Sequence, residues 1–232
     1  MVQNHSWVGL NTAVVDSIEA IRRLDYAIDR DGFTCVVALN NGPNRPLSPL
    51  LGHSYNAISV GRTDGRHSLG RTKFDVPGRV KPDLVAPEIG TSHASALVAA
   101  AAALLCQVTR ERSSLTKAGQ PECIKAILMA GATKDEFPSW NRTSARPLDE
   151  VFGAGDLNIY NSYHILTAGQ QHLGSTSNIA GMGWDVDRIP EGHTSRYFFS
   201  VATGSLMTKL SIMLVWNRHF SHGPAPGFDP AV

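Results

Sequence analysis

The chain has 232 residues, of which 42% are hydrophobic, and it carries a formal net charge of +1. This length and hydrophobic content suffice for one main domain with a substantial core and an appendage. A charge so close to zero gives no electrostatic reason for a nucleic acid or a membrane as partner, and we expect neither. No uninterrupted apolar run reaches the ~18 residues of a membrane span. The three cysteines fall in predicted strands and helices and are expected to be buried free thiols: Cys35, Cys106 and Cys123.

Helix and strand signals alternate along the first part of the chain. Apolar residues recur at three- and four-residue steps from Thr12 to Arg30, which predicts an amphipathic helix that ends at Gly32. A short apolar run from Thr34 to Leu39 then predicts a buried parallel strand. A further helix over Cys123–Ala130 is opened by Pro121 and followed by a glycine. This alternation is typical of an α/β fold with a parallel sheet that is covered on both faces.

A serine occupies the entrance to a long apolar segment. The sequence from Asp83 to Ala96 contains a Gly-Thr-Ser turn and leads into the alanine-rich run Leu97–Cys106, which predicts a helix buried in a core. Ser92 therefore comes at the first turn of that helix, near unpaired backbone N–H groups and the positive end of the helix dipole. These groups can stabilise a developing oxyanion next to a serine nucleophile. A helix cap is the alternative role for Ser92, because serine is common in that position.

Several segments resemble, in the same order, parts of the subtilisin-like serine proteases: 4–9, 34–42, 56–64, 78–96 and 153–166. The Gly-Thr-Ser turn is similar to the family's active-serine signature, which places Ser92 at the nucleophile. The strand before Asn40 is similar to the one that ends in the family's oxyanion-hole asparagine, which assigns that role to Asn40; a turn former is the alternative. The resemblance covers residues 1–168. It implies a subtilisin-like α/β domain with a doubly wound parallel sheet, here expected to be incomplete at its N-terminal side.

The resemblance also implies a substrate cleft. The segment 4–9 is similar to the family strand that forms one wall of the cleft, and the strand 34–39 lies beside it. The residues expected to line the primary specificity pocket are Ser6, Trp7, Gly9, Ala38 and Leu39. By this resemblance the chain is a serine endopeptidase that hydrolyses peptide bonds of a protein or peptide substrate through an acyl-enzyme on Ser92.

The Asp and His motifs of the family's catalytic triad are missing from this sequence. His93 is adjacent to Ser92, but neighbours on a helix point about 100° apart, so it cannot serve as the base. His193, with Asp185 and Asp187 upstream, would imitate a permuted triad in a solvated, turn-like stretch. We therefore expect the acid and the base to come from sequence outside this chain. The alternative is a non-catalytic fragment or pseudoprotease that binds extended peptides in the residual cleft.

The sequence changes character after residue 168. A polar stretch predicts a linker over 169–180, and alternation in Ser195–Val201 and Leu206–Trp216 predicts the first strands of a partial β-sandwich domain over 181–232. Members of the family often bind calcium, but no cluster of acidic residues has convincing ligand spacing, so no cofactor and no metal site are assigned. The resemblance suggests a secreted or extracytoplasmic protein, although no signal peptide is recognised in the chain.

Overall fold

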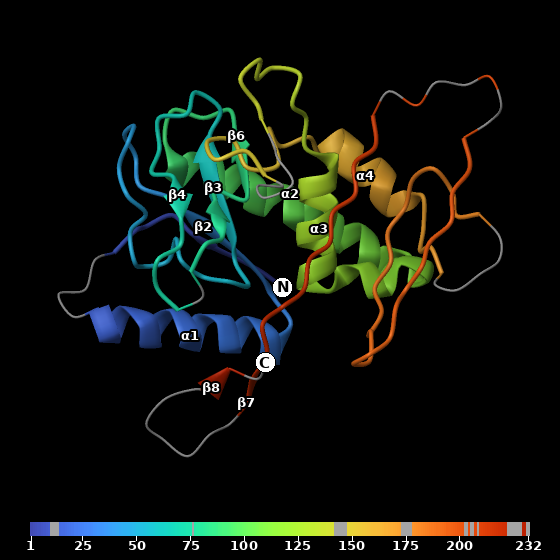
Figure 1. The fold of residues 1–232 in the computed structure, drawn as a ribbon, viewed down its shortest axis with the longest axis horizontal. Coiled ribbons are helices and arrows are strands. Elements are labelled where there is room, and N and C mark those ends of the chain that lie inside the picture. Colours follow the sequence, from blue (N-terminus) through green and yellow to red (C-terminus); the bar gives the residue numbers. More distant parts are fainter. Residues whose placement is uncertain are drawn as a thin grey trace.

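A four-stranded parallel sheet forms the centre of the molecule (Figure 1). The structure is a computed structural model, and it describes residues 1–9, 14–75, 77–141, 148–172, 178–201, 204, 207, 209–221 and 229–230. The strands of this sheet follow the order β1-β2-β3-β6, with the bounds β1 Val2–His5, β2 Thr34–Ala38, β3 Ile58–Arg62 and β6 Leu84–Ala86. The predicted α/β architecture with a parallel sheet is thereby confirmed.

Helices cover both faces of the sheet. On one face lies α1 (Val14–Asp31), which ends at Gly32 with a φ of 62°, as its sequence pattern predicted. On the other face lie α2 (Thr91–Glu111) and α3 (Pro121–Gly131), and α4 (Ile159–Thr167) packs against α3. A 3-10 helix, Ser113–Gly119, joins α2 to α3. The start of the predicted helix at Thr12 falls outside the described residues, as do residues 173–177 of the predicted linker.

Side chains of the central strands divide between two hydrophobic clusters, because successive residues of a strand point to opposite faces. Val36 and Val60 pack in the larger cluster with α2 and α3. Cys35 and Val37 pack in the smaller one, with Ile28 of α1. All three cysteines are free and buried, as predicted. Both faces of β2 are thus filled, which fixes the position of the polar residues that follow this strand.

A buried cluster of charged side chains lies at the start of β6. The Asp83 carboxylate, just before β6, accepts hydrogen bonds from Lys81 Nζ at 2.8 Å and from the Ser59 backbone N–H at 2.7 Å, and Lys125 Nζ of α3 lies 3.5 Å away. Burial opposes ionisation of Asp83, but the charges of Lys125 and Lys81 outweigh it and hold its pKa well below the usual range. Burial also lowers the pKa of Lys81 to about 8, against the attraction of Asp83. This cluster anchors the chain that leads to Ser92.

Helix α2 is long and apolar enough to cross a membrane by length and composition alone, with a mean hydropathy of 1.4 over its most apolar window. The expectation that no apolar run reaches the length of a membrane span does not hold for this helix, because its few polar residues leave the mean hydropathy high. Half of the window is buried inside the domain, where Val98 and Leu105 belong to the larger cluster. The helix therefore serves as a core helix in this fold.

The described residues of the predicted C-terminal strands show no strand. The described residues within Ser195–Val201 and within 209–216 have no regular secondary structure, and Leu206 lies outside the described residues. The beginning of a β-sandwich is therefore not shown. Trp184 instead packs in the larger cluster, and its Nε1–H donates to the Leu166 carbonyl at 2.8 Å. The segment 209–219 runs across α3 in Figure 1.

The described residues also contain two short antiparallel strand pairs. One joins β4 (Gly70–Arg71) to β5 (Val80–Lys81), beside the central sheet. The other joins β7 (Phe220–Ser221) to β8 (Asp229–Pro230). Phe220 is buried, so the chain end that bears β7 is held against the domain.

Candidate functional site

Ser92 lies in the first turn of α2, immediately after the glycine that begins the helix. Gly90 is the N-cap residue and supplies no side-chain cap. Thr91 is buried, and its Oγ1–H donates to the Leu39 carbonyl at 2.5 Å, which ties the serine loop to the end of β2. Ser92 is half-buried, and its hydroxyl makes no hydrogen bond to any residue that the structure describes. The hydroxyl is thus held on a rigid element with its lone pairs available.

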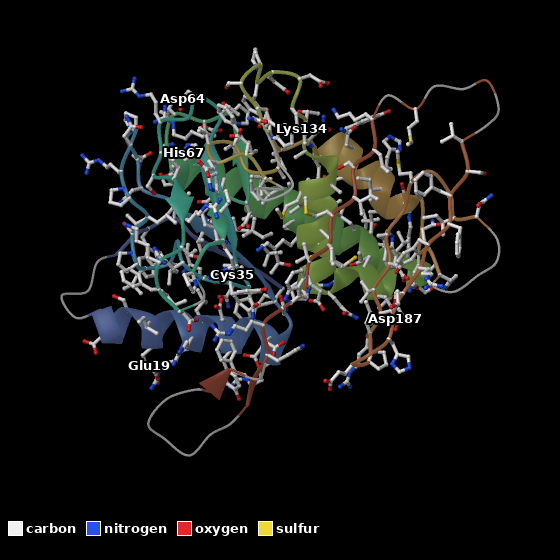
Figure 2. The ribbon with its side chains drawn as sticks, in the orientation of Figure 1. Glu19, Cys35, Asp64, His67, Lys134 and Asp187 are labelled. Atoms are coloured by element: carbon white, nitrogen blue, oxygen red, sulfur yellow. The ribbon has the colours of Figure 1, made fainter. Side chains whose placement is uncertain are left out.

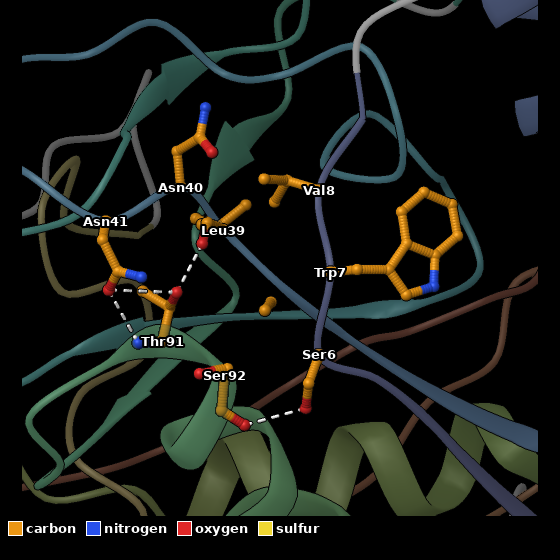
Figure 3. A pocket seen from close by; sticks show the side chains of 9 residues that line it. Ser6, Trp7, Val8, Leu39, Asn40, Asn41, Thr91 and Ser92 are labelled. Carbon is orange, nitrogen blue, oxygen red and sulfur yellow. Dashed lines mark hydrogen bonds between the residues drawn. The ribbon is translucent and has the colours of Figure 1, made fainter.

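A small cavity of about 140 Å³ opens beside Ser92 (Figure 3). Its walls come from the end of β1, the end of β2 and the first turn of α2. The lining residues are Ser6, Trp7, Val8, Ala38, Leu39, Asn40, Asn41, Thr91 and Ser92. None of them carries a charge. A desolvated charged group would therefore find no counter-ion in this cavity, so the cavity suits an uncharged ligand group.

The structure brings together most of the residues that the sequence singled out. Ser92, Asn40 and the wall residues Ser6, Trp7, Ala38 and Leu39 all line the cavity. Gly9 does not line it. It pairs instead with Leu50, to which its backbone N–H donates at 2.7 Å. Val8, Asn41 and Thr91 also line the cavity and were not predicted, although each is a direct neighbour of a predicted residue.

The Asn40 side chain faces away from Ser92 (Figure 3). Its Nδ2 donates to Ser48 Oγ at 2.6 Å, and its backbone N–H donates to Ser68 Oγ at 3.0 Å. Both bonds tie the end of β2 to residues further along the chain. An oxyanion role for Asn40 requires its amide to leave Ser48.

Three serines form a hydrogen-bonded cluster between β1 and α2. Ser6 Oγ donates to the Ser92 carbonyl at 2.8 Å and lies 3.1 Å from Ser95 Oγ. Ser95 Oγ also lies 3.0 Å from the Ser92 carbonyl, and Ser95 is fully buried. These bonds hold the chain after β1 against the first turn of α2, which sets the width of the cavity.

No histidine forms a hydrogen bond with Ser92 in the part of the chain that the structure describes. His5 is level with Val37, which faces α1, whereas the next residue, Ser6, faces α2 and Ser92. His67 is buried and bonded to the Arg62 backbone N–H and the Val151 carbonyl, at 3.0 and 2.9 Å. Burial lowers the pKa of His67, in keeping with a neutral, structural imidazole.

The alternative base also fails to reach the site. His193 is exposed, and its ring nitrogen contacts the Glu191 carbonyl at 3.1 Å. Asp185 is bonded to Gln170, and Asp187 lies on the other side of the molecule from His67 in Figure 2. Within the described ranges no three His, Cys, Asp or Glu residues are grouped so that they could hold a metal ion.

Comparison with protein families places this α/β fold with a serine at a helix entrance among the subtilisin-like peptidases. The model of the subtilase family matches residues 1–155, so the chain belongs to the subtilase family. The family is that of the subtilisin-like serine peptidases. No curated protein matches the chain.

Solved structures are similar to this chain over about 70% of its length. The PatG macrocyclase in complex with peptide is 16% identical with a TM-score of 0.50, over 71% of this chain and 51% of that chain. Tripeptidyl peptidase 2 is 19% identical with a TM-score of 0.44, over 72% of this chain and 14% of that chain. The chain thus spans about half the length of the PatG chain that it matches. At 16% identity the likeness to the PatG macrocyclase concerns the fold alone.

Proposed function

We propose that this chain carries the nucleophile and the substrate cleft of a serine endopeptidase. The observation that carries the proposal is the free Ser92 hydroxyl beside an uncharged cavity that is walled by two parallel strands. Family membership agrees with this reaction. The walls formed by Ser6, Trp7, Ala38 and Leu39 would hold the substrate side chain next to the scissile bond.

The proposed reaction is an acyl transfer to Ser92 and then to water. Ser92 Oγ attacks the peptide carbonyl carbon and gives its proton to a base, while the C=O electron pair moves onto the oxygen. The resulting oxyanion accepts hydrogen bonds from the Ser92 backbone N–H and from the side-chain amide of an asparagine at the end of β2, which the family resemblance assigns to Asn40. The C–N bond then breaks, the amine leaves with a proton, and water releases the acyl group from Ser92.

We propose further that the aspartate and histidine of the triad are supplied by polypeptide outside this sequence, since neither family motif is present, His67 is bonded to backbone groups and His193 is exposed. Residues 1–168 would form the peptidase domain, joined through 169–180 to a C-terminal unit over 181–232. A secreted location and a bound calcium ion stay proposals that rest on the family alone.

A second candidate function is a module that binds extended peptides without cleaving them. The observation that favours it is that Ser92 Oγ has no base among the described residues. The cleft walls would then pair with an extended peptide while Ser92 remains unreactive.

A fluorophosphonate probe distinguishes the two functions. We expect intact mass spectrometry to detect one covalent adduct on the folded chain when the polypeptide that supplies the aspartate and histidine is present; this adduct is lost in Ser92→Ala and kept in Ser113→Ala, an exposed serine outside the cavity. No adduct on such a folded sample, together with peptide binding that survives Ser92→Ala, would support the binding module and refute the endopeptidase.

A further inference from the structure

A second cavity lies at the opposite end of α2 from Ser92. It has a volume of about 510 Å³, and its walls come from the start of β1, the residue after α1, the last turns of α2, the 3-10 helix and the start of α3. In Figure 1 the N-terminus, where β1 starts, lies beside the end of α1. Cys106, which lines this cavity, follows Ser92 by about 21 Å along the axis of α2. The cavity is thus separate from the proposed peptidase site, and its volume is typical of a small-molecule site.

The floor of this cavity offers no strong side-chain donor. Pro121 is buried, and Cys106 is only 7% exposed. Thr109 is also buried, and its hydroxyl already donates to the Cys106 carbonyl at 2.8 Å. A charged group at this depth would lose its hydration without gaining hydrogen bonds from these side chains, whereas an apolar chain would be removed from water at no such cost.

The mouth of the cavity is positively charged. Arg110 is exposed, and it is the only charged side chain among the described residues that line the cavity. Neither Arg110 nor the exposed Gln120 side chain has a hydrogen-bond or ion-pair partner in the part of the chain that the structure describes. Burial raises the pKa of the Cys106 thiol, and the charges of the amino terminus and of Arg110 oppose this rise. Positive charge therefore lies within electrostatic reach of the apolar floor.

We propose that this cavity binds a small organic anion, namely a carboxylate with an apolar chain. The chain lies against Cys106 and Pro121, and the carboxylate stays at the mouth, where it pairs with Arg110. Hydrogen bonds between a guanidinium and a carboxylate are roughly twice as strong as neutral ones, and the Gln120 amide can donate a further one. An uncharged chain would leave Arg110 unpaired, and a bare anion would leave the floor unfilled. The proposal does not depend on the reaction at Ser92.

Alkylation of Cys106 by iodoacetamide reports whether the cavity is occupied. The reaction is followed at alkaline pH, where part of the thiol is ionised, by mass spectrometry of the peptide that contains Cys106. Octanoate is the probe ligand; octanamide lacks its charge, and acetate lacks its chain. Cys35 and Cys123 are 1% and 3% exposed and do not line the cavity, so Cys106 should react first in the free chain.

We expect saturating octanoate to slow the alkylation of Cys106 and to raise the melting temperature, because a ligand that binds only the folded chain stabilises it. Octanamide and acetate at the same concentration should each do much less. Arg110→Gln should weaken the octanoate affinity, read from the concentration that halves the protectable rate, about tenfold, as expected for the loss of a hydrogen bond to a charged group. Arg112→Gln removes the same charge from an exposed residue that is bonded to Tyr163 outside the cavity, and it should leave the affinity unchanged.

Three results would overturn the proposal. Equal protection by octanoate and octanamide would show that the charge of the ligand is not recognised. An unchanged octanoate affinity in Arg110→Gln would remove the ion pair at the mouth, and the absence of both protection and a rise in the melting temperature would remove the site. Arg110→Lys keeps the positive charge, so it should retain more of the affinity than Arg110→Gln does.

Discussion

Replacing Asp83 by asparagine should strongly destabilise the domain. The substitution keeps the shape of the side chain but removes the charge that Lys81 Nζ and Lys125 Nζ approach at 2.8 and 3.5 Å. The Lys81 and Lys125 side chains are only 2% and 9% exposed, so their charges stay buried without a carboxylate. Removing one partner of a buried ion pair typically costs about 3–5 kcal/mol. We expect a loss of about 4 kcal/mol, which is a large part of the ~5–15 kcal/mol by which such domains are stable.

Urea denaturation followed by far-UV circular dichroism measures this loss. The double variant Asp83→Asn/Lys81→Met should lose at least about 1 kcal/mol less unfolding free energy than the two single variants lose together, because removing the lysine also removes a buried charge that has lost its partner. A loss below about 1 kcal/mol in Asp83→Asn, or strict additivity in the double variant, would refute the view that these charges depend on one another.

Two further predictions concern the scaffold. Burial, assisted by the charge of Arg79, lowers the pKa of His53 from 6.5 to about 4, so the unfolded chain takes up a proton at this residue before the folded one does. Stability should therefore fall between pH 6.5 and pH 4 by about 2 kcal/mol more in the parent than in His53→Gln, allowing for solvent screening; equal pH profiles from urea denaturation would contradict this. Gly155→Ala should lower the free energy of unfolding by at least about 2 kcal/mol more than Gly169→Ala. Both glycines have a positive φ, but of the two only Gly155 has a backbone oxygen, that of Thr133, at 2.1 Å from where a Cβ would lie. Similar melting temperatures for the two variants would show that this contact relaxes.

Local sequence patterns predicted the framework of the site well. The periodicity of α1 reflects the burial of one helix face, and the continuous apolar run of β2 reflects a strand that is buried on both faces. Ser92 could be located because a Gly-Thr-Ser turn before an apolar run is a local signal. The Thr91 backbone N–H donates to the side-chain amide of Asn41, 50 positions away, whereas the Asn40 amide bonds to Ser48, and no local pattern predicts this difference. The direction in which each amide points is a tertiary property of the folded chain.

The C-terminal strands show how an alternating pattern can mislead. Alternation in 209–216 is real, because Met213 and Val215 pack against the larger cluster whereas Ile212 and Leu214 are each 73% exposed. The apolar residues on the exposed side made the segment look like one strand of a sheet. A strand also needs a partner for its backbone, and the segment instead lies along α3, where Ser211 Oγ donates to the Ala130 carbonyl at 3.1 Å.

The position of β1 gives the cavity an unequal pair of walls. Among the described strands β1 stands at the end of the sheet and is paired only with β2, whereas β2 is paired on both sides. The wall that continues from β1 into Ser6 and Trp7 is therefore displaced at a lower cost in free energy than the wall after β2, because fewer backbone hydrogen bonds must break. Large ligands would then enter by displacing this wall, while Ser92 and the end of β2 keep their places. Amide hydrogens of β1 should accordingly exchange with solvent faster than those of β2.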